Sequence, residues 1–165
     1  MTASVHDLLE GLIGRSGVEA ARTADALDAL ELITVDEDGW PHVALLSAGE
    51  ILPTTGDQLA LCLWPRSSTS RNLARQGRAL LYVATRGRSA KVRLHVEPLG
   101  PVAVGDHTFA GFLARAEGAQ PDNVSYAEIL SGVRYRLTDV GGVVDRWHDQ
   151  LAALDAAVEA RDQRT

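Results

Sequence analysis

Cysteine is almost missing from this 165-residue sequence. Cys62 stands alone in the apolar segment LALCLW, so one chain can form neither an internal disulfide nor a cysteine-based metal cluster. We predict that Cys62 is a small buried hydrophobic residue. The five histidines are scattered singly, with no second ligand at metal-binding spacing, and we therefore expect no metal site.

Long apolar runs and a secretion signal are also missing. No run approaches the roughly 20 apolar residues that a membrane-spanning helix needs. The first residues, MTASVHDLLEGLIGRSG, lack the basic start and apolar stretch of a signal peptide. We expect a cytoplasmic protein without a membrane segment, folded as a single domain over residues 1–165 because the chain is short for two.

Three glycine-based signatures are absent, and each absence excludes a class of protein. The sequence has no phosphate loop ending in Gly-Lys-Ser/Thr, and GRSG and VGGVV lack the three-glycine spacing of dinucleotide-binding folds. No serine stands in the Gly-x-Ser-x-Gly elbow of a hydrolase. Phosphate-loop nucleotidases, dinucleotide-binding enzymes and elbow hydrolases are therefore not expected.

Acidic residues are absent from Gln58 to Val96, although the net charge of the chain is −6. Half of the 16 basic residues fall in this acid-free block: Arg66, Arg71, Arg75, Arg78, Arg86, Arg88, Lys91 and Arg93. The acidic total argues against a nucleic-acid or membrane-surface binder. The block needs an anionic ligand, an acidic surface elsewhere in the fold, or a subunit interface that balances its charge.

Hydrophobic periodicity and turn residues predict an α+β fold, mainly β, in which helices flank an antiparallel sheet or barrel. The barrel spans residues 31–139 and follows N-terminal helices in residues 1–30. The expected strands are 31–36, 41–48, 58–64, 78–84, 90–104 and 133–140. The expected later helices are 68–76, 106–117, 125–130 and 143–162. Asp38-Gly39 is a hairpin turn, and Pro98 and Pro101 confine their strand to an edge or a bend.

The segment WPRSSTSRNLARQGRALLYVA, residues 64–84, suits a phosphate group. A strand that ends at Trp64 is followed by Arg66 and a run of hydroxyl residues at the start of a helix. Free backbone amides and the helix dipole favour an anion there, and arginine adds paired hydrogen bonds. The alternative is a serine cap on a surface helix whose arginines are solvated.

ALELITVDEDGWPHVALLSAG followed by DQLALCLWPRSSTSRNLARQGRALLYV resembles the FMN-binding split-barrel family related to pyridoxamine 5'-phosphate oxidase. Gly39 and Pro41 match the family's turn, Ser67 its phosphate-site serine, and Asn72-Leu73 its short helix. The resemblance covers about residues 27–95 and implies an antiparallel split β-barrel.

The resemblance also implies a homodimer and a set of FMN-binding residues. The residues expected to contact the phosphate are Arg66, Ser67 and Thr69, with Arg71 and Asn72 in support. The residues expected to lie along the flavin are Leu45, Leu46 and Ser47. On this reading Arg66 and Arg71 face the ligand, whereas Arg75 and Arg78 meet solvent or a partner subunit.

The resulting expectation is an FMN-dependent oxidoreductase that acts on an unidentified small molecule, with its chemistry on the flavin. The residues identify no acid-base catalyst. Three alternatives remain open: a non-catalytic protein that binds flavin, the deazaflavin F420 or haem; a barrel that uses F420; and a degenerate barrel dimer without a cofactor.

Overall fold

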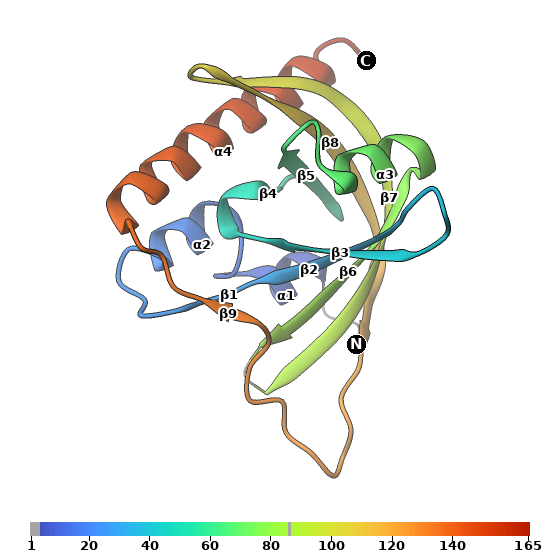
Figure 1. Ribbon diagram of the computed structural model, residues 1–165, viewed down its shortest axis with the longest axis vertical. Helices are drawn as coiled ribbons and strands as arrows, with labels where there is room; N and C mark the ends of the chain where they lie inside the picture. The colour runs from blue at the N-terminus through green and yellow to red at the C-terminus, as the bar shows by residue number, and fades with distance from the viewer. Residues whose placement is uncertain (1–3, 86) are drawn as a thin grey trace.

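A seven-stranded antiparallel sheet is the centre of the computed structural model, which describes residues 4–85 and 87–165 (Figure 1). Its strand order is β3-β2-β6-β7-β8-β5-β4. These strands are β2 (Leu30–Val35), β3 (Pro41–Leu46), β4 (Ile51–Pro53), β5 (Gln58–Leu63), β6 (Arg78–Thr85), β7 (Arg88–Val104) and β8 (His107–Pro121). The edge strands β3 and β4 do not pair with each other, so the sheet is not closed. The expected α+β split barrel is confirmed.

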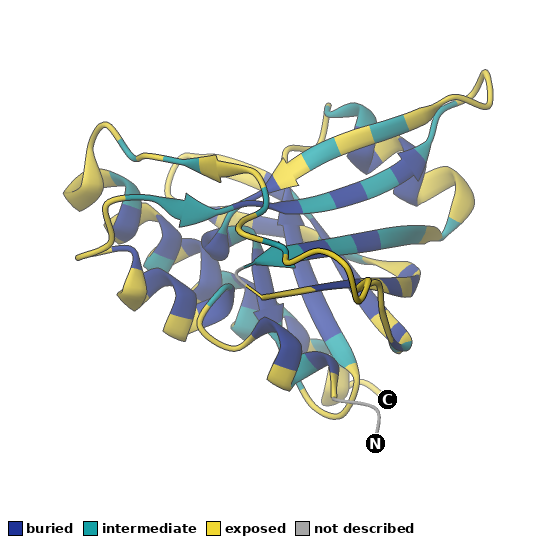
Figure 2. Cartoon of the chain, turned by 90° about the horizontal axis from the view of Figure 1, so that it is seen from below, coloured by how far each residue is buried: buried dark blue, intermediate teal, exposed yellow. Residues whose placement is uncertain are grey.

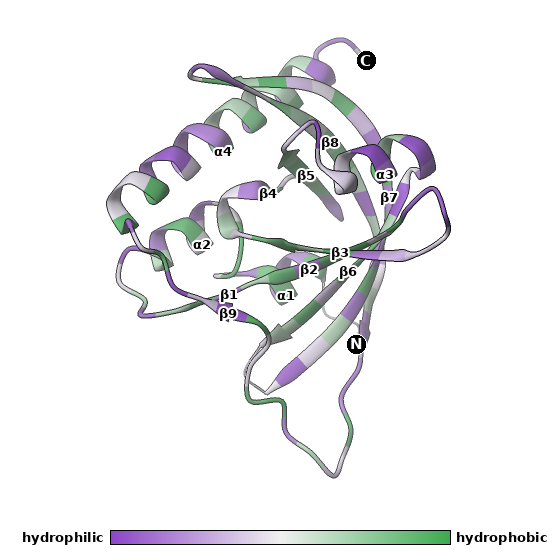
Figure 3. Cartoon of the chain, in the orientation of Figure 1, coloured by the Kyte–Doolittle hydropathy of each residue, from purple (hydrophilic) through white to green (hydrophobic). Residues whose placement is uncertain are grey.

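Helices and a small second sheet surround this barrel. The helices are α1 (Val5–Leu9), α2 (Gly14–Ala20), the 3-10 helix η1 (Ala48–Glu50), α3 (Ser68–Gln76) and α4 (Val140–Asp162). The second sheet pairs β1 (Leu27–Asp28) with β9 (Arg134–Tyr135). Hydrophilic and hydrophobic residues alternate along α4 in Figure 3, as the predicted amphipathic helix requires. No helix within residues 4–85 and 87–165 is both long and apolar enough to cross a membrane.

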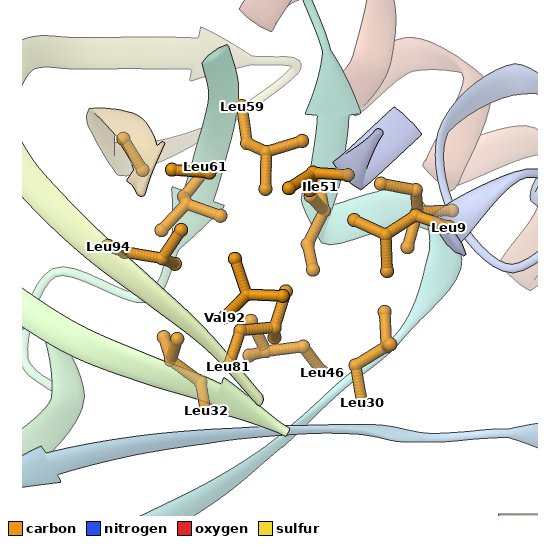
Figure 4. Close-up of a cluster of buried hydrophobic side chains, with 14 of the residues drawn as sticks. Leu9, Leu30, Leu32, Leu46, Ile51, Leu59, Leu61, Leu81, Val92 and Leu94 are labelled. Carbon is orange, nitrogen blue, oxygen red and sulfur yellow. The ribbon is translucent and has the colours of Figure 1, made fainter. Parts of the chain in front are cut away.

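Two hydrophobic cores lie on opposite faces of the sheet. The first fills the barrel, where Leu32, Leu46, Leu61 and Leu81 point toward one another (Figure 4). The second lies beneath α4 and includes Trp147, which is 4% exposed. The burial colouring in Figure 2 shows strands on which buried and exposed residues alternate, as expected where one face of a strand meets solvent.

Several predicted boundaries agree with the structure. The β2–β3 hairpin turns at Gly39, which has a φ of 87°. The predicted helix 68–76 is α3, and Gly77 ends it in the left-handed conformation. The proline-containing strand is β7, and its part around Pro98 and Pro101 pairs with β8 alone because the pairing with β6 stops at His95, so the expected edge position is present. It has a register shift between Pro98 and Gly100, so the expected bend is present.

The predicted helix 106–117 is wrong, because these residues belong to strand β8. Residues on both faces of β8 are buried: Phe112 and Ala114 face the barrel core, and Phe109 and Leu113 lie in the core beneath α4. A strand buried on both faces is apolar at nearly every position, so its pattern can imitate helical spacing. Asp106, expected to be a helix cap, belongs instead to the turn between β7 and β8.

Three shorter predictions are also corrected. Residues 125–130 form no helix, and Tyr126 and Leu130 are 89% and 76% exposed, so packing does not offset the cost of a short helix. The N-terminal helices end at Ala20, and residues 27–28 form β1 instead. The predicted strand 133–140 is reduced to the two residues of β9.

Candidate functional site

The predicted phosphate segment forms the start of α3. Beyond β5, Ser67 takes the N-cap position, and its Oγ accepts a hydrogen bond from the Ser70 amide at 3.1 Å. The Trp64 carbonyl accepts from the Ser67 amide at 3.1 Å and from the Ser70 hydroxyl at 2.7 Å. The turn is therefore held by its own hydrogen bonds. The first amides of α3 remain without intrahelical acceptors, as at any helix start.

Two of the predicted arginines lie at this turn. The Arg71 guanidinium folds back over the helix start, where it donates to the Arg66 carbonyl and, at 3.1 Å, to Ser68 Oγ. Arg66 is exposed and forms no ion pair with any residue that the structure describes. No acidic residue lies in the first turn of α3. Charge and dipole therefore both favour an anion at this helix start.

Thr69 and Asn72 are buried, each 3% exposed. The Asn72 amide donates to Thr34 Oγ1 at 3.0 Å, and its oxygen accepts from Arg75 at 3.3 Å. Asn72 therefore joins α3 to β2. Arg75 also donates to the Val35 carbonyl, so it contacts its own hairpin, and it remains exposed to solvent as expected.

The other predicted residues lie at the end of β3. Leu45 is 55% exposed, whereas Leu46 is 3% exposed and belongs to the barrel core, because neighbouring strand residues face opposite sides. Ser47 is engaged by Glu50 Oε2, which accepts from the Ser47 amide at 2.7 Å and from its hydroxyl at 2.9 Å. A direct contact between a flavin and these residues stays a prediction.

A cavity of about 370 Å³, here called the α4 recess, lies between α4, η1 and the end of β5. Its lining includes Ser47, Glu50, Trp64, Phe109, Leu137, Val143, Arg146, Trp147 and Gln150. The Trp64 ring lies 4.6 Å from the Phe109 ring between centroids, and the Trp64 carbonyl accepts the hydrogen bonds of the α3 turn. Trp64 therefore connects the recess to the predicted phosphate site.

Glu50 has an unusual electrostatic setting in this recess. Its burial raises the pKa of the carboxyl above the usual range, while the hydrogen bonds from Ser47 and the positive charge of Arg146 oppose that rise. Arg146 approaches from α4 but forms no ion pair with Glu50. A carboxyl with a raised pKa in a cavity is typical of functional sites.

A second cavity, about 610 Å³ and here called the outer groove, is lined by residues of β2, β6, β7 and β8. Arg78 and Arg93 lie in it, and so does His95, which contacts Glu117. The hydrogen bond from His95 lowers the pKa of Glu117. None of the predicted site residues lines this groove.

The acid-free block is therefore divided among several places. Arg66 and Arg71 lie at the α3 start, Arg78 and Arg93 lie in the outer groove, and Lys91 pairs with Asp122 at 2.9 Å. Arg86 lies outside the described residues.

Glu50 and Arg146 were not predicted as site residues. Ser47 and Glu50 have the Ser-x-x-Glu spacing of a capping box, which the sequence displays and which could have drawn attention to Glu50. Arg146 has no comparable signal, because only the fold brings α4 to the end of β3.

Comparison with solved structures defines the class of fold. A structure described as an F420 reductase is 16% identical and aligns with a TM-score of 0.50 over 73% of this chain and 98% of its own. An FMN-binding protein from Syntrophomonas wolfei subsp. wolfei is 16% identical, with a TM-score of 0.48 over 72% of this chain and 88% of its own. The chain shares the split-barrel fold of the F420 reductase structure.

Comparison of sequences identifies a relative with higher identity than these two structures. The uncharacterized protein YclD of Bacillus subtilis (strain 168) is 35% identical over 127 residues, which are 77% of this chain and 82% of YclD. The chain belongs to the same family as YclD. No family model matches the sequence.

Proposed function

We propose that this protein binds FMN, or the related deazaflavin F420, and acts as a flavin-dependent oxidoreductase on a small molecule. The observation that carries the proposal is the start of α3. There a capped helix places free amides, Arg66 and Arg71 together with no acidic residue in the first turn. The names of the structural neighbours, an F420 reductase and an FMN-binding protein, support a cofactor of the flavin type.

The residues of this site fit the phosphate of such a cofactor. Arg66 is free to pair with it, and Arg71 is held beside the helix start by Ser68. The Thr69 side chain would add a hydroxyl, while Ser67 and Asn72 would fix the geometry of the turn through their own hydrogen bonds. Leu45 on the exposed side of β3 would contact the apolar part of the ring system.

The flavin supplies two-electron transfer when bound. The part of this chain is to hold and orient it, and the α4 recess beside Trp64 offers space for a second molecule. The reaction that this supports is an oxidation or reduction of a small molecule, whose identity no residue specifies.

The absorption spectrum of the purified protein tests the cofactor. We expect a yellow protein that releases FMN on denaturation, or a colourless one that becomes yellow on addition of FMN or F420. A protein that retains neither after incubation with both would contradict the proposal. Turnover of a chemically reduced flavin with an electron acceptor would then separate an enzyme from a simple binder.

We also propose that the protein forms a homodimer through the outer face of β3, β2 and β6. Ile33 lies in register with Val43 on one side and Leu80 on the other, which makes an apolar row across three strands. Val43 and Leu45 are 53% and 55% exposed on this face. Neighbouring exposed apolar side chains of this kind mark interaction surfaces.

Light scattering after size-exclusion chromatography tests the dimer. We expect twice the chain mass for the wild type and a monomer for the double variant Val43→Asp, Leu45→Asp. Val124→Asp is the matched control, since Val124 is 47% exposed and lies outside the three strands of this face. A monomeric wild type would contradict the proposal.

A further inference from the structure

Two charged groups in the α4 recess lack partners. Glu50 uses Oε2 for both hydrogen bonds with Ser47, and its Oε1 has no hydrogen-bond donor in the described part of the chain. The Arg146 guanidinium has neither a carboxylate within ion-pair distance nor a hydrogen-bond acceptor among the same residues. The recess therefore presents one acceptor, on Glu50, and one group of donors, on the exposed Arg146, that form no ion pair with each other.

Aromatic rings form much of the surrounding wall. Trp64 is 53% exposed although its ring lies 4.6 Å from that of Phe109, so the indole remains available on the cavity side. Trp147 closes the wall from α4. Flat aromatic surfaces of this kind favour stacking with a planar ligand.

The charges of Glu50 and Arg146, together with the aromatic wall, restrict which ligands the recess can hold. A simple anion would meet the charge of Glu50, and a simple cation would meet that of Arg146. A purely apolar ligand would cover both groups and leave them unsatisfied, which is costly for buried polar atoms. A ligand that satisfies both must present a donor and an acceptor, and a flat body suits the aromatic wall.

We propose that the α4 recess binds a planar heteroaromatic ring through a cyclic amide edge. The ring N–H donates to Glu50 Oε1, the neighbouring carbonyl accepts from Arg146, and the ring face packs against Trp64. The cavity of about 370 Å³ lies at the small end of the range for ligand sites and suits one or two fused rings.

Two sources can supply this edge. One is the pyrimidine end of a bound flavin, since the recess adjoins the α3 start at Trp64, and this source rests on the proposed function. The other is a separate small molecule that binds beside the flavin or without it. The shared chemistry, an N–H next to a ring carbonyl, is the same for both.

Lumazine, a two-ring compound with an N–H between two carbonyls, is the probe. Its binding to flavin-free protein is measured by calorimetry beside that of its 1,3-dimethyl derivative, which has no ring N–H. We expect the derivative to bind at least about tenfold more weakly, the usual size of a lost hydrogen bond to a charged group. Equal binding of the two compounds, or no binding of lumazine, overturns the proposal.

Two substitutions locate the contacts. In Glu50→Gln, the amide oxygen can still accept from Ser47, as glutamine does in capping boxes, but an N–H replaces the free acceptor. We expect about a tenfold weaker lumazine affinity for this variant and for Arg146→Gln. Arg164→Gln, just beyond the end of α4, is the matched control and should bind like the wild type. Unchanged binding to both recess variants overturns the assignment.

Repeating the titration with saturating FMN separates the two sources. Competition assigns the edge to the flavin itself, and unchanged lumazine affinity assigns it to a separate molecule. Lumazine binding by a protein that does not bind flavin would sustain this inference while contradicting the proposed function.

Discussion

Gly49 and Trp147 approach so closely that no side chain fits between them. A Cβ on residue 49 would lie 2.2 Å from Cγ of Trp147 and 2.3 Å from its Cδ1. Trp147 is 4% exposed in the core beneath α4, so it has little room to move. This contact fixes α4 against η1 and thereby shapes one wall of the α4 recess.

Gly49→Ala should therefore destabilise the protein, by about 1–3 kcal/mol as in other overpacked cores. Chemical denaturation measures the difference. Gly141→Ala is the matched control, because a Cβ there meets nothing within 4 Å, and alanine suits the α4 helix better than glycine. Equal stability of Gly49→Ala and the wild type would show that Trp147 does not pack over Gly49.

The buried hydrogen bond between Asn72 and Thr34 gives a second prediction. Thr34→Val leaves the Asn72 amide without its acceptor, which should cost about 1–3 kcal/mol of unfolding free energy. The double variant Thr34→Val, Asn72→Ala should lose less than the sum of the single losses, since the bond can be broken only once. Fully additive losses would mean that the two side chains do not interact.

Cys62 should be inert in the folded protein. The side chain is 1% exposed, and burial raises the pKa of the thiol to about 11. Since the thiolate is the reactive form, the native protein should react very slowly with a thiol reagent at neutral pH, and the denatured protein should react at once. Rapid labelling of the folded state would show that β5 opens readily.

Glu50 should make the stability of the protein depend on pH. Its pKa is raised by burial in the folded state, so the folded protein binds this proton more tightly than the unfolded chain. The stabilisation is complete at low pH and is lost as pH rises from the usual glutamate range through the folded-state pKa.

Urea unfolding at a series of pH values measures this effect. The stability of Glu50→Gln relative to the wild type should increase with rising pH across that window, because glutamine does not ionise. The same change at the exposed Glu10 is the matched control. A constant difference between Glu50→Gln and the wild type at all pH values would contradict the raised pKa.

Much of the fold could be predicted from local signals. The Asp38-Gly39 turn, the serine cap of α3 and Gly77 at its end each act within a few residues, and the structure confirms them. Strand β8 could not be recognised, because its apolar pattern results from α4 packing on one face and the barrel core on the other. That contact joins segments far apart in the sequence.

The candidate site likewise combines residues that are neighbours in the sequence with residues that only the fold brings together. Arg66, Ser67 and Arg71 follow one another along the chain, so their meeting at a helix start was predictable. The α4 recess joins Glu50, Trp64 and Arg146 from three separate segments. Of Glu50 and Arg146, which were not predicted, only Glu50 could have been noticed in the sequence, through its capping-box spacing from Ser47. The buried role of Asn72 depends on Thr34, which the sequence does not mark as its partner.

The most direct test of the central claim compares the affinities of FMN and riboflavin, which differ only by the phosphate. For the double variant Arg66→Ala, Ser67→Ala, we expect FMN affinity to fall by about a hundredfold and riboflavin affinity to change little, since Arg66 would pair with the phosphate and Ser67 caps the turn that presents the amides to it. Arg164→Ala, beyond the end of α4, is the charge-matched control, and circular dichroism checks that α3 remains folded. Equal losses for the two ligands would place the phosphate elsewhere, and failure of the wild type to bind FMN, riboflavin or F420 would contradict the account.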